Sequence, residues 1–202
     1  HVGTKKTDNV KITCIRYNQA SFQENTCPSI KASFDANLKD QVFWINIDGL
    51  HDTKVIAECG ELFNLHPLLL EDILNTRHRP NTQNFDYYVS LSLKMLGVSA
   101  DGKRIVVEQV SFVVGENWIL SFQEQEGDLF DGLRDRMREG KGKARVSGAD
   151  YLFYRLVDTI VDNYFLVADH LNQRTENLEG NVLQNPATAV FREIQLIKRM
   201  HI

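Results

Sequence analysis

The sequence predicts an α/β fold, in which a mixed, largely antiparallel sheet is sandwiched by helices (α/β/α) and followed by long C-terminal helices. Three observations predict it. Apolar runs of strand length alternate with segments of helical spacing over the first part of the chain. Tight-turn residues join neighbouring runs, which indicates antiparallel pairing. From Ser147 on, apolar residues recur at three- and four-residue steps.

Five segments are expected to form strands. Residues 10–15 alternate between apolar and polar side chains, and residues 42–47 form a continuous apolar run that the turn pair Asp48-Gly49 closes. Three further strand-like runs follow a break at Arg79-Pro80-Asn81, and Ala100-Asp101-Gly102 forms the tip between the first two. These runs are residues 87–96, 105–114 and 118–122.

Helices are expected between and after these strands. Residues 53–63 and 130–137 have helical apolar spacing, and a further helix begins near Pro67, a residue that suits a first helical turn. Ser147 is a favourable N-cap for a helix of roughly 35 residues, well beyond the average of about 11–12. We therefore divide the chain into an α/β/α domain, residues 1–146, and a helical arm, residues 147–202.

The arm has a heptad-like apolar stripe and then a break at Asn185-Pro186. A second amphipathic helix is expected from Ala187, and it reaches Ile202 without a stop signal. This pattern favours truncation inside a longer protein, and a frayed natural end is the alternative. The stripe consists of Tyr151, Tyr154, Val157, Val161, Tyr164, Ala168, Leu171, Thr175, Leu178 and Val182.

Composition and motifs narrow the class of function. A net charge of −4 and a pI near 5.9 give no reason to expect nucleic acid binding. Three dispersed cysteines favour a reducing compartment, and no apolar run approaches the 18–20 residues or so that a membrane helix needs. The phosphate-binding, dinucleotide-binding and nucleophile-elbow motifs are missing, so we expect neither an enzyme nor an organic cofactor.

Two groups of carboxylates could bind a cation. Glu71 and Asp72 are adjacent on a helix, so their side chains diverge by about 100° and would suit two neighbouring ions or one ion at a subunit boundary. Favourable interaction with the helix dipole is the alternative explanation. The second group lies on one face of the long helix, where a divalent cation, Arg155 or plain solvation would offset the repulsion between like charges. Its members are Asp158, Asp162, Asp169 and Glu176.

Several ordered motifs resemble the soluble domain of CorA-type magnesium transporters. They run from about Val10 to the end of the chain. The motifs are Phe43-Trp44-Ile45-Asn46-Ile47-Asp48-Gly49-Leu50-His51, Leu65-His66-Pro67-Leu68 with Leu70-Glu71-Asp72-Ile73-Leu74, Arg79-Pro80, Glu108-Gln109-Val110-Ser111-Phe112, Ser121-Phe122-Gln123-Glu124, Ala149-Asp150-Tyr151-Leu152 and Val157-Asp158-Thr159-Ile160-Val161-Asp162-Asn163-Tyr164-Phe165.

The resemblance implies a regulatory domain on the cytoplasmic side of the inner membrane, soluble by itself, in a homopentameric Mg²⁺/Co²⁺ transporter. Contact with the membrane would be made only through a C-terminal part beyond this chain. Mg²⁺, Co²⁺ or another divalent cation would bind between neighbouring domains, and bound Mg²⁺ would favour the closed pore. Carried over residue by residue, the metal ligands are Glu71, Asp72 and Asp158, whereas Asp162 stays ambiguous.

Three other interpretations compete with this one. A zinc transporter resembling ZntB has a similar soluble domain, and the set of Glu71, Asp72 and Asp158 favours the CorA type over it. A metal-dependent hydrolase would need its ligands and a base in one cleft, but no motif unites these carboxylates. A structural oligomerisation scaffold would account for the heptad-like stripe alone.

Overall fold

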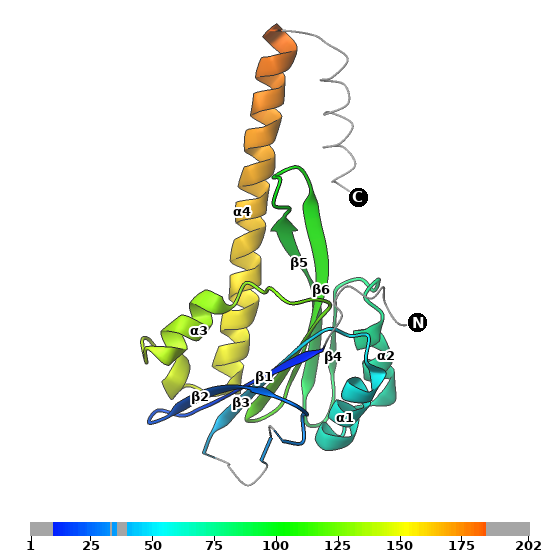
Figure 1. Cartoon of the computed structure of the whole chain (residues 1–202), viewed down its shortest axis with the longest axis vertical. Helices are drawn as coiled ribbons and strands as arrows, with labels where there is room; N and C mark the ends of the chain where they lie inside the picture. Colours follow the sequence, from blue (N-terminus) through cyan, green and yellow to red (C-terminus); the bar gives the residue numbers. More distant parts are fainter. Residues whose placement is uncertain (1–9, 33, 36–39, 185–202) are drawn as a thin grey trace. The chain divides into compact units, whose positions relative to one another are not determined.

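The structure is a computed structural model that describes residues 10–32, 34–35 and 40–184. It contains a seven-stranded sheet with the strand order β2-β1-β3-β7-β6-β5-β4 (Figure 1). The strands are β1 (Lys11–Tyr17), β2 (Phe22–Cys27), β3 (Val42–Asp48), β4 (Asn81–Asn84), β5 (Val89–Val98), β6 (Ile105–Val114) and β7 (Trp118–Gln123). The helices are α1 (Thr53–Phe63), α2 (Pro67–Leu74), α3 (Asp131–Arg138), a short 3-10 turn η1 (Ala144–Val146) and α4 (Ala149–Gln184).

The chain divides into two compact units. The first unit comprises His1–Met95 and Glu108–Asp158, and the second comprises Leu96–Val107 and Thr159–Ile202. This division differs from the expected boundary at residue 146, because the first turns of α4 belong to the first unit and the tip of the β5–β6 hairpin belongs to the second.

The sheet is mixed, as expected. Strands β1 and β2, β1 and β3, β4 and β5, and β6 and β7 pair in antiparallel fashion. Strands β3 and β7 run parallel, with Phe43 opposite Trp118 and Asp48 opposite Gln123. The carboxyl ends of these two strands therefore lie side by side at one edge of the sheet.

The sequence did not reveal the two outermost strands. Strand β2 reads FQENTC and β4 reads NTQN, so neither has the apolar side chains on which the expectation of a strand rested. Edge strands need only one hydrogen-bonded neighbour and commonly carry polar residues. The break assigned to Arg79-Pro80-Asn81 consequently ends one residue earlier, because Asn81 already begins β4.

Helices cover both faces of the sheet in the first unit, which confirms the α/β/α arrangement (Figure 1). On one face Ile45 and Ile47 belong to the same buried cluster as Ile56 and Cys59 of α1 and Ile73 of α2. On the opposite face, residues of β3 and β6 contact other segments. Trp44 packs edge-on against Phe130, with ring centroids 5.9 Å apart, and Phe112 lies 5.8 Å from Phe153 of α4.

Local sequence accounts for the start of α2. Pro67 occupies the first helical turn, and the Nδ1 atom of His66 accepts a hydrogen bond of 3.2 Å from the backbone N–H of Leu68. The expected helical position of Pro67 is confirmed, and the His66 side chain serves as a cap.

The long helix α4 exists, but its buried face differs from the expected stripe. The buried apolar residues are Ala149, Leu152, Leu156, Ile160, Val167 and Leu178, and of these only Leu178 belongs to the expected stripe. Tyr154 is 55% exposed and Val161 is 41% exposed. Both sets satisfy three- and four-residue steps, so spacing alone did not separate them. The interior contains mainly branched aliphatic side chains, and most of the tyrosines and polar residues lie outside it. Helix α4 begins at Ala149, so Gly148 rather than Ser147 precedes its first turn.

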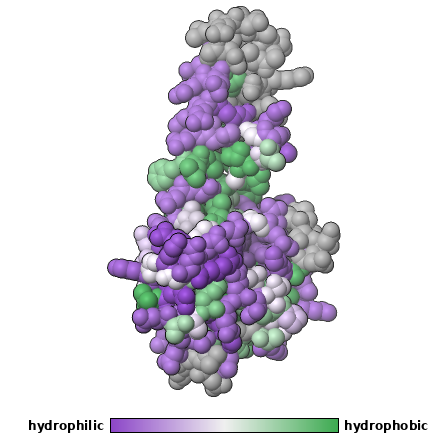
Figure 2. All heavy atoms as spheres, turned by 60° about the vertical axis from the view of Figure 1, so that its left-hand side comes forward, coloured by the Kyte–Doolittle hydropathy of each residue, from purple (hydrophilic) through white to green (hydrophobic). Residues whose placement is uncertain are grey.

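The second unit contains the hairpin tip and the later turns of α4. The Asn163 side-chain amide donates to the carbonyl of Leu96, and His170 Nε2 lies 3.0 Å from the carbonyl oxygen of Gly102. Arg174 donates to the Lys103 carbonyl at 2.8 Å. Exposed apolar side chains also gather on this unit, where Figure 2 shows green atoms, and they belong to Val98, Val106, Val107, Val161, Phe165 and Leu166.

Two expectations concern the C-terminal part of the chain. The second helix expected from Ala187 lies outside the described residues. Among the helices that the structure describes, none has the length and apolarity needed to cross a bilayer.

Candidate metal-binding residues

The adjacent carboxylates Glu71 and Asp72 lie on α2 and have different surroundings. Glu71 is exposed, whereas Asp72 is half-buried and accepts a hydrogen bond of 2.8 Å from the side-chain amide of Gln83 on β4. His78 Nε2 lies 3.9 Å from the other Asp72 carboxylate oxygen. Residues of the following loop and edge strand thus orient Asp72, while Glu71 points into solvent.

Asp158 lies on α4 at the end of the first unit. Its Oδ2 atom is 3.3 Å from Arg155 Nη1, and each side chain is 31% exposed. The repulsion between the carboxylates on α4 is therefore offset by Arg155 at Asp158. The other three members, Asp162, Asp169 and Glu176, are exposed, so solvent offsets the repulsion there. A partly exposed ion pair of this kind contributes only about 0–1 kcal/mol, so a cation could displace Arg155 at small cost.

The three predicted ligands do not meet within one copy of the chain. Glu71 and Asp72 belong to α2 on one face of the sheet, and Asp158 belongs to α4 on the opposite face. Within the described residues no group of three or more His, Cys, Asp or Glu side chains is placed to hold a metal ion.

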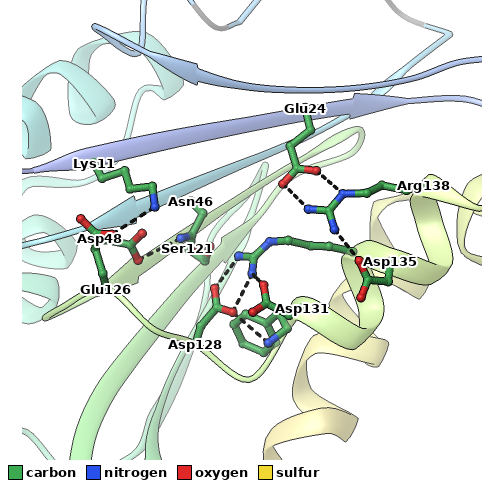
Figure 3. Close-up of polar contacts among 12 residues, drawn as sticks. Lys11, Glu24, Asn46, Asp48, Ser121, Glu126, Asp128, Asp131, Asp135 and Arg138 are labelled. Carbon is green, nitrogen blue, oxygen red and sulfur yellow. Dashed lines mark hydrogen bonds and ion pairs between the residues drawn. The ribbon is translucent and has the colours of Figure 1, made fainter.

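A charged cleft that the sequence did not reveal opens on the α3 face of the first unit. It has a volume of about 450 Å³ and lies where the parallel strands β3 and β7 end (Figure 3). Asp48, the last residue of β3, forms part of its wall and is only 5% exposed. Lining residues come from β1, β2, β3, α3 and the segment that leads into α3. They include Lys11, Glu24, Asn46, Glu126, Asp128 and Arg134.

Ion pairs organise most of the charges around this cleft. Arg134 on α3 donates to Asp128 through both terminal nitrogens and to Asp131 at 3.0 Å, and its guanidinium carbon lies 4.9 Å from the centre of the Trp44 ring. Lys11 Nζ lies 3.1 Å from Glu126 Oε2. Arg138 pairs with both oxygens of Glu24, at 2.7 and 2.9 Å.

Asp48 differs from these carboxylates because it is buried. Burial raises its pKa to about 6, and the negative charge of Asp128 acts in the same direction. The hydrogen bond from Asn46 and the positive charges of Lys11 and Arg134 act in the opposite direction and keep the shift limited. In the sequence the only signal was an acidic residue at the end of an apolar strand, which we interpreted as half of a turn pair.

Comparisons with known proteins place the chain in a family. The family described as "CorA-like Mg2+ transporter protein" matches residues 39–202. The cobalt/magnesium transport protein CorA of Thermotoga maritima is 35% identical over 195 residues, which cover 96% of this chain and 56% of that protein. The chain therefore belongs to the CorA-like transporter family, whose members are transporters and not enzymes.

Solved structures agree at the level of the fold. The soluble domain of CorA from Methanocaldococcus jannaschii matches with a TM-score of 0.69 at 14% identity, over 93% of this chain and 71% of that one. The ZntB cytoplasmic domain from Vibrio parahaemolyticus matches with a TM-score of 0.62 at 13% identity, over 94% of this chain and 74% of that one. Both soluble domains thus have the fold of this chain.

Proposed function

We propose that this chain is the divalent-cation-sensing regulatory domain of a Mg²⁺/Co²⁺ transport protein. It would lie on the cytoplasmic side of the membrane, and Mg²⁺ bound between neighbouring copies would favour the closed pore. The observation that supports this proposal most directly is the placement of Glu71 and Asp72 on one face of the sheet and of Asp158 on the other. With that placement, each copy would supply Glu71 and Asp72 to a site shared with one neighbour and Asp158 to a site shared with the other.

The same placement favours a ring. A contact in which the α2 face of one copy meets the α4 face of the next is heterologous, and a heterologous contact closes into a ring when its rotation permits. A two-fold dimer would instead pair like faces and leave Glu71 and Asp72 opposite their own counterparts. The homopentamer that the family resemblance implies is one such ring, and we propose it for the full-length protein.

Charge neutralisation supplies the gating energy in this proposal. Carboxylates on facing surfaces repel each other, and a divalent ion between them replaces the repulsion with bridging contacts. Mg²⁺ retains several of its waters, so one or two carboxylates for each ion are enough. The ion shifts the equilibrium between packed and splayed rings only by its difference in affinity for the two states. Removal of the ion would therefore let the copies separate and the pore open.

Calorimetric titration of Mg²⁺ into the full-length protein tests the ligand assignment. We expect Glu71→Ala, Asp72→Ala and Asp158→Ala each to weaken binding, because each removes a charged oxygen ligand. Glu61→Ala is the matched control, since Glu61 is an exposed acid of α1 that pairs with Lys31 at 3.7 Å. Unchanged Mg²⁺ affinity in all three variants would contradict the assignment.

A zinc transporter of the ZntB type is the second candidate, because the fold of a ZntB cytoplasmic domain matches that of this chain. The two candidates differ in the transported ion. Uptake of labelled Mg²⁺, Co²⁺ and Zn²⁺ into liposomes that contain the full-length protein separates them. We expect transport of Mg²⁺ and Co²⁺, and transport of Zn²⁺ alone would favour the second candidate.

A further inference from the structure

A chain of hydrogen bonds along one face of the sheet ends on the Asp48 carboxylate. The indole N–H of Trp44 donates to Ser121 Oγ at 2.9 Å, and Ser121 donates to Asn46 Oδ1 at 2.5 Å. Asn46 Nδ2 in turn donates to Asp48 Oδ1 at 3.0 Å. All four residues are buried, so these hydrogen bonds fix the orientation of the Asp48 side chain (Figure 3).

Asp48 forms no direct ion pair among the described residues, although the charges of Lys11 and Arg134 act on it from a distance. Every other carboxylate that lines the cleft forms an ion pair: Glu126 with Lys11, Asp128 and Asp131 with Arg134, and Glu24 with Arg138. Asp48 receives one side-chain hydrogen bond, at Oδ1, and the described side chains provide no donor for its Oδ2 atom. A buried carboxylate without a direct ion pair is costly, so a cation placed next to Oδ2 would offset part of that cost.

The net charge of the cleft indicates the charge of such a ligand. Five carboxylates and two cationic side chains line it, which gives a formal charge of −3 when all are ionised. The lining side chains are mostly polar, and Figure 2 shows that the surface around α3 is predominantly hydrophilic. A cation is therefore favoured over an anion or a neutral apolar molecule.

We propose that this cleft binds a small organic cation through a primary ammonium group, with Asp48 as its counter-ion. An ammonium group brings three hydrogen-bond donors and needs acceptors rather than a complete set of inner-sphere ligands. The described residues offer no group of three side chains able to hold a metal ion. The volume of about 450 Å³ also exceeds what a bare ion needs and suits an extended diamine. The proposal is independent of the Glu71, Asp72 and Asp158 site.

The two tryptophans of the chain make the test direct. Trp44 is linked to Asp48 through Ser121 and Asn46, whereas Trp118 packs on the opposite face, with its ring centroid 4.6 Å from that of Phe63. Titration with 1,4-diaminobutane, followed by the indole N–H resonances of the isotope-labelled chain, is expected to shift the Trp44 signal saturably and to leave the Trp118 signal in place. 1,4-Butanediol serves as the uncharged comparison and MgCl₂ as the metal comparison.

The Asp48→Asn variant is expected to bind the diamine about tenfold more weakly or worse, because one charge-assisted hydrogen bond is lost. The matched control is Glu139→Gln, which removes the same charge from a 53% exposed acid outside the cleft, and its affinity is expected to stay close to that of the parent. Equal losses in both variants would indicate diffuse attraction and overturn the proposal. Saturable binding of MgCl₂ in place of the diamine would overturn the ammonium assignment, and no saturable shift with any probe would overturn the site.

A measurement on the unmodified chain covers the case in which Asp48→Asn fails to fold. Lys11, Asn46, Glu126, Asp128 and Arg134 surround Asp48, and with its pKa near 6 only about one tenth of Asp48 is ionised at pH 5. Affinity for 1,4-diaminobutane is therefore expected to fall about tenfold between pH 7.5 and pH 5. Affinity that is unchanged at pH 5 would contradict a role for Asp48.

Discussion

The Asp48 carboxylate should lower the stability of the chain at neutral pH. Its pKa is about 6 in the folded chain and about 3.9 in an unfolded one, so the folded chain binds more protons between these values. Stability therefore falls as pH rises from about 4 to 6, and the full cost, about 3 kcal/mol, is present above pH 6. Asp48→Asn removes this cost.

Urea unfolding at pH 4 and pH 7 tests this prediction. Relative to the parent chain, we expect the free energy of unfolding of Asp48→Asn to rise by up to about 3 kcal/mol between pH 4 and pH 7. The reason is that only the parent chain has a carboxyl group at position 48 that loses its proton in this range. Asp131→Asn, at an exposed position, should show little change between the two pH values. A stability difference between Asp48→Asn and the parent that is the same at both pH values would contradict the buried charge.

Arg155 is expected to compete with a cation for Asp158. The two side chains are 3.3 Å apart, and Mg²⁺ at Asp158 must displace or share that contact. Arg155→Gln should therefore lower the Mg²⁺ concentration at which the full-length protein associates, by a few-fold, since an exposed pair contributes about 0–1 kcal/mol. Sedimentation across a Mg²⁺ series measures the midpoint, and a midpoint that rises would argue against Asp158 as a ligand.

The individual residues show what the sequence could and could not reveal about the sites. The motifs predict Glu71, Asp72 and Asp158 as ligands. Their separation by the sheet depends on which face each helix covers, and no local pattern encodes that. The cleft was missed because its walls come from β1, β2, β3 and α3, which are far apart in the chain. Asp48 itself matched a turn pair and gave no sign of burial.

At the scale of elements, a buried ion pair and a ring contact attach α3 to the sheet. Arg134 pairs with Asp128 and lies over the Trp44 ring, and both ionic side chains are less than a tenth exposed. Arg134→Met would leave Asp128 buried without its cation, which costs about 3–5 kcal/mol. Denaturant unfolding should show this loss.

Two further variants identify the cause of that loss. The double variant Arg134→Met with Asp128→Asn should recover much of the lost stability, because it removes the stranded charge as well. Asp131→Asn should change stability by less than about 1 kcal/mol, because Asp131 is exposed. A double variant as unstable as Arg134→Met alone would assign the loss to packing against Trp44.

The elements also show where sequence patterns succeed. Apolar runs identified β1, β3, β5, β6 and β7, because these strands contribute side chains to the buried layers. The edge strands β2 and β4 escaped because backbone pairing with a single neighbour stabilises them and requires no apolar pattern. On α4 the length of the helix was predictable, whereas the buried stripe depended on Leu152, Leu156 and Ile160 rather than on the tyrosines.

At the scale of the whole molecule, the two faces of the sheet take different roles in the proposal. In the proposed ring, the α2 face would present Glu71 and Asp72 to one neighbour, and the α4 face would present Asp158 to the other. The ammonium cleft opens on the α3 side at the strand ends, and none of its lining residues is a proposed Mg²⁺ ligand. The two proposed sites can therefore be altered one at a time.

A lysine in place of Glu71 should take over the role of the proposed bridging ion. Glu71→Lys places an ammonium group where Mg²⁺ would lie, so it can pair directly with Asp158 of the neighbouring copy. We expect the full-length Glu71→Lys protein to stay assembled in a chelator and to respond little to added Mg²⁺, whereas the parent protein loosens on chelation. Glu61→Lys, which makes the same charge change at an exposed position of α1, should keep the ion dependence of the parent.

Cross-linking and sedimentation with and without chelator measure this difference in assembly between the variants. Equal Mg²⁺ dependence in Glu71→Lys and Glu61→Lys would show that Glu71 does not face Asp158 across the interface.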